Sequence, residues 1–167
     1  DVMFEYTGCY VPKDITSVRF NDGFQKIEDC AFRHCKSLES ITLPPTVTEI
    51  GGSAFLDCSN LREVRLNDGL QKIGNEAFSK CTSLESIKLP STVTEIGNFA
   101  FHSCRNLRGV TLNEGLEKIQ KWAFIYCSSL ESITIPPTVT EIGGSAFLDC
   151  SNLREVRLND RLQKIGV

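Results

Sequence analysis

Long apolar runs are absent from this sequence of 167 residues: no segment approaches the ~20 consecutive apolar residues that a membrane-spanning helix requires. Its first residues show neither the basic segment nor the apolar stretch of a secretory signal, and no Asn-x-Ser/Thr glycosylation site occurs. A strong net charge is also missing, since the formal charge is -3. These absences argue against membrane insertion and against a nucleic-acid partner, and they leave the cellular compartment open.

The sequence lacks a recognisable catalytic or metal-binding arrangement of residues. The two histidines, His34 and His102, occupy nonequivalent positions and have no nucleophile at a repeated offset. Cys30, His34 and Cys35 are close in sequence, but no fourth metal ligand follows at a suitable spacing. The Gly-Gly-Ser loop at Gly51 lacks the lysine of a phosphate-binding loop. We therefore expect a protein that is not an enzyme and that uses no cofactor and no metal.

A repeat of 23 residues organises the rest of the chain. Ala-Phe dipeptides begin at Ala31, Ala54, Ala77, Ala100, Ala123 and Ala146. A column of cysteines follows at Cys35, Cys58, Cys81, Cys104, Cys127 and Cys150, and a column of leucines at Leu38, Leu61, Leu84, Leu107, Leu130 and Leu153. One unit of this length cannot bury its apolar face alone, so the units must stack on one another.

A second period of 46 residues is superimposed on the first. Units that carry Pro-x-Thr-Val-Thr-Glu-Ile, from Pro44, Pro90 and Pro136, alternate with units that carry Asn-x-x-Leu-x-Lys-Ile, from Asn67, Asn113 and Asn159. Charges alternate with the same period, in the column Lys26, Glu49, Lys72, Glu95, Lys118, Glu141 and Lys164. In a stacked sheet each of these charges meets opposite neighbours on both sides, which favours one register over a slipped one.

The unit predicts an α/β repeat, a leucine-rich-repeat solenoid wound as a right-handed parallel coil and shaped as an arc or horseshoe. Residues 38–43 have the alternation of a short strand, with Ile41 and Leu43 inward, and Val47 and Ile50 belong to a second extended segment. We expect the segment from Ala54 to Cys58 to form a short helical turn, because Phe55 and Cys58 lie three residues apart. Stacking then builds a ladder of phenylalanines in the core.

One continuous domain is expected. Residues 15–167 form about six to seven units of the solenoid, the first of them degraded, and residues 1–14 form a capping segment over the open end of the core. The six column cysteines should be buried thiols that behave as small hydrophobic residues. Cys9 and Cys30 lie outside the column and are the one candidate disulfide pair, although free thiols are the favoured interpretation.

The repeat also carries a family resemblance. The spacing Leu38-x-x-Ile41-x-Leu43-Pro44-x-x-Val47-x-x-Ile50-Gly51-x-x-Ala54-Phe55-x-x-Cys58 resembles the BspA-like, or Treponema pallidum type, leucine-rich repeat, and the match covers residues 15–166. The resemblance implies an arc of short parallel strands that serves as a binding or adhesion module on microbial or protist surfaces. It brings no catalytic residues, and it is the sole basis for expecting an extracellular or cell-surface location.

Positions where the repeats differ are the candidates for recognition. The residue before Ala-Phe is Phe99 in one unit and Trp122 in the next, where other units have Cys, Ser or Glu. His102, Ile125 and Tyr126 follow within a few residues. Together they could form an exposed apolar patch for a protein partner. The alternative, which we weigh equally, is that Phe99 and Trp122 pack over the loops of neighbouring units.

A second candidate surface is the outward face of the predicted strands. It is small, polar and mildly basic, and Arg65, Lys88 and Thr111 represent it in successive units. Solenoids use such extended faces for recognition, although a solvated face without a partner fits the same residues. The face has no row of aromatic residues for stacking nucleotides.

Two functions follow from the sequence. The first is a non-catalytic module of the protein-binding or adhesion type. The alternative is a structural or self-associating repeat scaffold, natural fragment or engineered, without a dedicated ligand. The chain stops at Ile165-Gly166-Val167, where the next Ala-Phe is due, so we expect an uncapped C-terminal end through which a homodimer could form.

Overall fold

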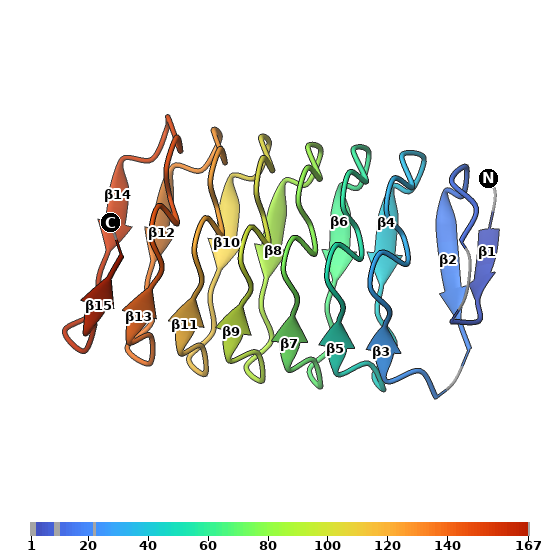
Figure 1. The fold of residues 1–167 in the computed structure, drawn as a ribbon, viewed down its shortest axis with the longest axis horizontal. Coiled ribbons are helices and arrows are strands. Elements are labelled where there is room, and N and C mark those ends of the chain that lie inside the picture. Colours follow the sequence, from blue (N-terminus) through green and yellow to red (C-terminus); the bar gives the residue numbers. More distant parts are fainter. Residues whose placement is uncertain (1–2, 9–10, 22, 167) are drawn as a thin grey trace.

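The computed structural model of the chain, which describes residues 3–8, 11–21 and 23–166, is a parallel β-solenoid with one 23-residue unit in each turn. Figure 1 shows the turns side by side along the long axis of the molecule. The first side of the coil holds three-residue strands: β4 (Ser40–Thr42), β6 (Glu63–Arg65), β8 (Ser86–Lys88), β10 (Gly109–Thr111), β12 (Ser132–Thr134) and β14 (Glu155–Arg157). Their central residues alternate with exposed neighbours, as the sequence pattern predicts.

The second side is a continuous parallel sheet of seven two-residue strands among the described residues. They are β3 (Lys26–Ile27), β5 (Glu49–Ile50), β7 (Lys72–Ile73), β9 (Glu95–Ile96), β11 (Lys118–Ile119), β13 (Glu141–Ile142) and β15 (Lys164–Ile165). Each isoleucine is in register with the isoleucine of the next turn, and each Lys with a Glu. The predicted stacking of like residues is therefore present, and the charges alternate across the sheet as expected.

The three-residue strands pair two by two: β4 with β6, β8 with β10, and β12 with β14. This pairing has the 46-residue period of the sequence, because each pair joins a Pro unit to the Asn unit that follows it. The side chain of Asn67 holds the first pair together: Nδ2 donates to the carbonyl oxygens of Pro44 and Val47, both at 2.9 Å, while Oδ1 accepts from the amide of Gly69. The alternation of the two unit types thus has a structural counterpart.

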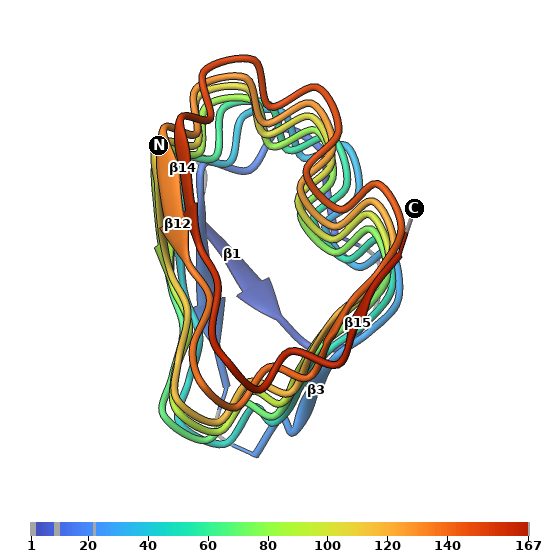
Figure 2. The same ribbon diagram turned by 90° about the vertical axis from the view of Figure 1, so that its left-hand side faces the viewer.

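The third side consists of turns, and here the prediction of short helical turns is wrong: the described residues contain no helix. Along this side, every second backbone amide donates a hydrogen bond to a carbonyl of the next turn of the coil. The amide of Phe55, for example, donates to the carbonyl of Ala77 at 2.8 Å. The residues before Ala-Phe and before Cys have positive φ, for example Ser53 at 54° and Asp57 at 59°. Left-handed residues at these two positions prevent successive residues from following a right-handed helix. The three sides can be seen along the axis of the coil in Figure 2.

The phenylalanine ladder fills the core as predicted. Phe55 stacks on Phe78 with 5.2 Å between ring centroids and 3° between ring planes, and Phe78 stacks on Phe101 at 5.5 Å and 8°. All three side chains are fully buried, as are the column cysteines Cys58 and Cys81. The dispersion and hydrophobic contributions of these ladders hold the turns at one spacing.

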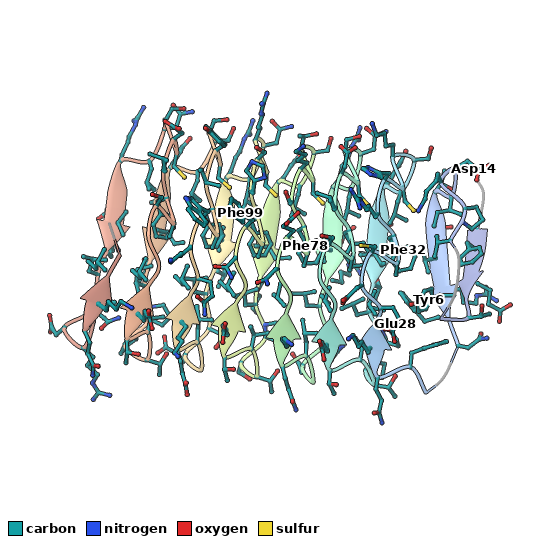
Figure 3. The ribbon with its side chains drawn as sticks, in the orientation of Figure 1. Tyr6, Asp14, Glu28, Phe32, Phe78 and Phe99 are labelled. Carbon is teal, nitrogen blue, oxygen red and sulfur yellow. The ribbon has the colours of Figure 1, made fainter. Side chains whose placement is uncertain are left out.

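The N-terminal end of this core lies against a further pair of parallel strands, β1 (Met3–Tyr6) and β2 (Ser17–Phe20). The ring of Tyr6 is fully buried and lies 5.2 Å from that of Phe32 and 5.1 Å from that of Phe24. Figure 3 shows Tyr6 beside Phe32 at this end of the molecule. Within the part of the chain that the structure describes, no helix could cross a membrane.

Candidate partner-binding surfaces

The turn side presents Phe99 and Trp122 from left-handed backbone positions, with φ of 55° and 56°. Bulky side chains rarely adopt this conformation. Hydrogen bonds between turns keep it: the amide of Phe99 donates to the carbonyl of Lys121, and that of Trp122 to the carbonyl of Gly144, both at 3.1 Å. The same backbone position holds Ser53 and Ser145 in other turns, so the fold itself does not require an aromatic residue here. A strained position occupied by an unusual residue is a reason to look for function.

Phe99 and Trp122 stack on each other, with 4.8 Å between ring centroids and 15° between ring planes. His102 lies edge-on to Phe99 at 5.8 Å and is tilted toward Tyr126 at 5.9 Å. Phe99, His102 and Trp122 are half-buried, and Tyr126 is 45 % exposed. We call these four residues the aromatic cluster.

Ile125 differs from the sequence-based expectation. It is only 7 % exposed, so it offers little surface to a partner, and we leave it out of the aromatic cluster. In the same column, Leu148 is 47 % exposed because the column of turns ends there. Sequence reasoning did not single out Leu148, although its place at the end of the column predicts its exposure.

His102 is the titratable member of the aromatic cluster. Burial lowers its pKa below the ordinary value, and the nearby positive charge of Lys80 lowers the pKa further. A hydrogen bond of 2.9 Å joins its Nδ1 atom to the hydroxyl of Ser79 in the preceding turn. His102 is therefore neutral at pH 7 and is held in place by Ser79.

A hollow of about 360 Å³ borders the aromatic cluster on the side of the preceding turns. Leu56, Ser79, Phe99 and His102 line it, together with the charged residues Arg33, Glu76 and Lys80. Sequence reasoning missed this hollow. The signal that could have revealed it is the small Ser79, which stands between Leu56 and His102 in one column of the repeat.

The strand face is a separate surface. Arg65, Lys88 and Thr111 end strands β6, β8 and β10 in three successive turns, and all three side chains are exposed. Lys88 and Thr111 are in direct register, whereas Arg65 donates from Nε to Glu63 of its own strand at 2.6 Å. The structure thus brings these three residues together, but it places them on the side with the strands, away from the turns that carry the aromatic cluster (Figure 2).

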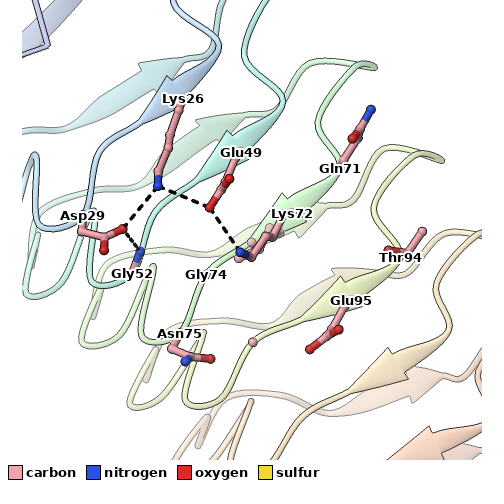
Figure 4. Close-up of a pocket in the computed structure, with 12 residues that line it drawn as sticks. Lys26, Asp29, Glu49, Gly52, Gln71, Lys72, Gly74, Asn75, Thr94 and Glu95 are labelled. Carbon is pink, nitrogen blue, oxygen red and sulfur yellow. Dashed lines mark hydrogen bonds and ion pairs between the residues drawn. The ribbon is translucent and has the colours of Figure 1, made fainter.

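The charged sheet of two-residue strands holds a larger hollow, of about 550 Å³ (Figure 4). Most of its charges have partners: Glu49 lies 3.5 Å from Lys26 and 3.3 Å from Lys72, and Glu95 accepts a hydrogen bond from Gln120 at 2.6 Å. Glycines such as Gly74 form its floor because the turns approach closely there: a Cβ atom on Gly74 would lie 2.8 Å from the backbone of Gly51. Satisfied charges over closely packed backbone indicate a structural role for this side.

The comparisons with known proteins agree with this geometry. The BspA type leucine rich repeat region matches residues 6–130 and 71–167, in six copies. The chain belongs to the BspA type leucine-rich repeat family. A Treponema pallidum leucine rich repeat protein has a similar structure, with a TM-score of 0.83 and 33 % identity over 98 % of this chain and 76 % of that one.

Two further solved structures resemble this BspA type chain. One is a leucine rich cell surface protein of Faecalibacterium prausnitzii, with a TM-score of 0.78 and 27 % identity over 93 % of this chain and 47 % of that one. The other is a leucine-rich repeat protein of Bacteroides ovatus, with a TM-score of 0.67 and 27 % identity over 99 % of this chain and 48 % of that one. The chain spans about half the length of these two proteins. No functionally curated protein matches it.

The cysteines of this BspA type chain fall into two groups. Those of the repeat column are buried, and Cys35 lies inward with them, whereas Cys30 is an exposed free thiol. Cys9, the other half of the candidate disulfide, lies outside the described residues. His34 bonds through Nδ1 to Asp57 at 3.0 Å, and no set of three His, Cys, Asp or Glu side chains is arranged for a metal among residues 3–8, 11–21 and 23–166.

The last described turn exposes apolar side chains. Val156, Leu158 and Ile165 are 38 %, 52 % and 58 % exposed, whereas residues of the same columns in the middle of the solenoid, such as Ile87 and Leu89, are buried. In the middle of the solenoid, each turn covers the core side chains of its neighbour. This contrast shows how much of the burial in this repeat comes from the adjacent turn.

Proposed function

We propose that this BspA type chain is a non-catalytic protein-binding module of the adhesion type, and that the aromatic cluster is the centre of its recognition surface. The observation that carries the proposal is the stacked pair of Phe99 and Trp122, half-buried on backbone of positive φ. Other turns fill the same position with Ser, Cys or Glu, so the aromatic pair is an addition to the fold and not part of it.

The chemistry of the aromatic cluster suits a protein partner. Tryptophan and tyrosine are enriched among the residues that dominate binding energy at protein interfaces, because they bury a large area with little loss of conformational entropy. Trp122 and Tyr126 provide such area, and the stacking of Phe99 on Trp122 fixes the orientation of both rings before a partner arrives. A preorganised surface loses less entropy on binding than a mobile one.

The absence of catalysis is part of the same proposal. The six column thiols are buried in the core. Burial raises the pKa of Cys58, Cys104 and Cys127, which makes these thiols poor nucleophiles. The neutral ring of His102 is hydrogen-bonded to the hydroxyl of Ser79. We extend the proposal to an extracellular or cell-surface location, because the similar protein of Faecalibacterium prausnitzii is a cell surface protein.

The test is binding of the purified chain to an array of extracellular matrix and cell-surface proteins. The double variant Phe99→Ser/Trp122→Ser should lose the proteins that the unmodified chain binds, since Ser53 and Ser145 show that the backbone position accepts serine. The matched control is Arg65→Ser/Lys88→Ser on the strand face, which should retain them. If only the control loses binding, the recognition surface is the strand face of Arg65, Lys88 and Thr111. Unchanged binding by both variants, or no binding by the unmodified chain, contradicts the proposal.

Self-association is the second candidate function, and the exposed Val156, Leu158 and Ile165 favour it. A second copy of the 167-residue chain could cover these side chains by adding its own turn to the stack. Light scattering over a range of concentrations tests this: a dimer that Leu158→Glu/Ile165→Glu converts to monomer supports it. A monomer at every concentration contradicts it.

A further inference from the structure

The hydrogen bonds of the strand side stop at every second junction between turns. Strand β10 pairs with β8, and β12 pairs with β14, but β10 and β12, both fully described, belong to different sheets. Within the first pair, the amide of Leu89 donates to the carbonyl of Thr111 at 3.0 Å. Among the described residues, the equivalent amide of Leu112 makes no such bond to Thr134. We call the junction between β10 and β12 the seam.

The sequence explains why the seam is open. Within a pair, an asparagine of the second turn donates from Nδ2 to the backbone of the first. Asn113 donates in this way to the carbonyl of Val93 at 3.0 Å, and Asn159 to that of Pro136 at 2.6 Å. Across the seam, the residue in the asparagine position is Pro136 itself. Proline has neither a backbone N–H group nor a side-chain donor, so Pro136 makes no such bond to the turn of β10.

A hydroxyl group that could close the seam is also left without a bond. At the junction between β6 and β8, the hydroxyl of Thr92 donates to the carbonyl of Asp68 in the preceding turn at 3.1 Å. The equivalent hydroxyl at the seam belongs to Thr138. Its oxygen is buried and has no hydrogen-bond partner among the described residues. The seam is therefore joined less tightly than the junction between β6 and β8.

Side-chain packing is looser at the seam as well. A hollow of about 270 Å³ lies over it, and its apolar lining consists of Val110, Leu112, Ile133 and Pro136. Leu112 is partly exposed, whereas the equivalent Leu89 inside a pair is only 3 % exposed. The contrast shows that a paired neighbour covers this leucine and that an unpaired one does not.

The other two sides of the coil remain closed at the seam. Strands β11 and β13 are in register, and the amide of Phe124 donates to the carbonyl of Ala146 at 2.8 Å. The core rings stay stacked, but their spacing follows the same period within a narrow range. From the turn of β4 to that of β12 the centroids lie 5.2, 5.5, 5.2 and 5.5 Å apart, and the longer spacing falls where the strands are unpaired.

We infer that the seam is a hinge of the solenoid, where the strand side opens and closes while the sheet of two-residue strands and the turn side hold the turns together. The pairs β8–β10 and β12–β14 then move as rigid blocks, and the curvature of the coil changes between them. The aromatic cluster lies wholly in the turns of β8 and β10. Hinge motion therefore leaves Phe99 stacked on Trp122 and changes the angle between the aromatic cluster and the next block. The hinge does not depend on the proposed function, and only its use in fitting a partner does.

Distances between spin labels on two sides of the coil test the hinge. One pair of labels is attached through Lys88→Cys/Arg157→Cys, three turns apart on the strand side and separated by the seam. The control pair is attached through Glu95→Cys/Lys164→Cys, three turns apart on the sheet of two-residue strands. All four positions are exposed, so labels there should leave the core intact.

The labels require the full chain without its two thiols outside the buried column, which Cys9→Ser/Cys30→Ser removes. Position 30 should accept serine, because Ser53 and Ser145 occupy the same place in other turns. We expect the distance distribution on the strand side to be about twice as wide as that on the sheet side, since only the strand side moves. Equal widths on the two sides would overturn the inference.

Pro136→Asn is the variant that decides. It places at the seam the residue that joins the turns within a pair, and its Nδ2 group should donate to the carbonyls of Asn113 and Leu116, as Asn67 does to its own preceding turn. The strand-side distribution should narrow to the width of the sheet-side one. Pro136→Ala removes the same ring without adding a donor, so it is the matched control and should leave the distribution wide. Equal narrowing by both variants contradicts the hinge.

Amide exchange followed by NMR shows whether Pro136→Asn has closed the seam. In the unmodified chain, the amide of Leu112 should exchange about a hundredfold faster than that of Leu89. In Pro136→Asn it should slow to the rate of Leu89, because a closed seam lets it donate to Thr134. If exchange slows while the distribution stays wide, the seam is not the hinge. If exchange stays fast, the proline is not what holds the seam open. Neither measurement includes a partner, so the protein array can fail while the hinge stands, and the reverse.

Discussion

The thiol of Cys104 donates a hydrogen bond to the carbonyl oxygen of Phe78 in the preceding turn, with 3.2 Å between Sγ and the oxygen. Cys58 bonds in the same way to Phe32 at 3.0 Å, and Cys127 to Phe101 at 3.1 Å. The column of cysteines is thus more than a set of small apolar side chains. It also links each turn to the backbone of the one before it.

Thiol labelling should separate the column cysteines from Cys30. Burial raises the pKa of Cys81 and Cys104 well above the ordinary value, and neither thiol is accessible, whereas Cys30 is exposed. We expect iodoacetamide at pH 8 to modify Cys30 in the native chain and the column cysteines only after unfolding in urea. Peptide mapping by mass spectrometry gives the sites. Modification of Cys81 or Cys104 in the native chain as fast as that of Cys30 would contradict the buried column.

Phe101→Ala should lower the free energy of unfolding by about 3 to 5 kcal/mol, because it removes a fully buried ring and leaves a cavity. Phe101 lies between Phe78 and Phe124, with centroids 5.5 and 5.2 Å away. Urea denaturation measures the loss. The exposed Tyr126→Ala is a control on the same turn side, with an expected change of less than half that size. Equal losses in the two variants would show that the ladder does not dominate the core.

Asn67→Asp should destabilise the chain by about 1 to 3 kcal/mol, the usual cost of leaving buried hydrogen-bonding groups without partners. The substitution replaces the Nδ2 donor by an oxygen, which then faces the carbonyl oxygens of Pro44 and Val47. Asn60→Asp is the matched control, because Asn60 is exposed in the turn that precedes β6, and it should change stability by less than about 0.5 kcal/mol. A harmless Asn67→Asp would mean that this side chain does not hold the paired strands together.

The free energy of unfolding should fall at acid pH because His102 becomes protonated. Its folded pKa lies below the unfolded value of 6.5, so the unfolded chain binds the proton more readily between these two values. The contribution of neutral His102 is complete above pH 6.5 and is lost as the pH falls through the folded pKa. His102→Gln should therefore lose less stability than the unmodified chain between pH 7.5 and 5.5, as measured by urea denaturation at each pH. An identical loss in both would assign the pH dependence to other groups.

The columns of the repeat could be predicted from the sequence, because one dry core imposes the same residue type at the same place in every turn. The helical turn could not. Phe55 and Cys58 have the spacing of one helical face, but Ser53 and Asp57 adopt positive φ. The residue types at these two positions vary too much from turn to turn to indicate that conformation. Hydrogen bonds between turns, which depend on the stack as a whole, decide the local backbone.

The candidate surfaces were only partly predictable. Phe99 and Trp122 stand out in the sequence because their neighbours in the column are small or polar, and the structure adds that they stack on each other. The hollow beside Phe99 is lined by side chains from several successive turns, and their packing cannot be predicted from one unit of the repeat. Ile125 is a large apolar residue next to Tyr126, as a surface anchor would be, yet the turns on both sides bury it.

The account depends on successive turns that are joined by continuous hydrogen-bond ladders, and amide hydrogen exchange measures this directly. The amides of Phe55, Phe78 and Phe101 each donate at 2.8 Å to an alanine carbonyl of the next turn. We predict that they exchange about a thousandfold or more slowly than in an unstructured peptide, because exchange requires global unfolding. Exchange of these amides at rates close to those of an unstructured peptide would show that the turns are independent loops and would contradict the stacked solenoid.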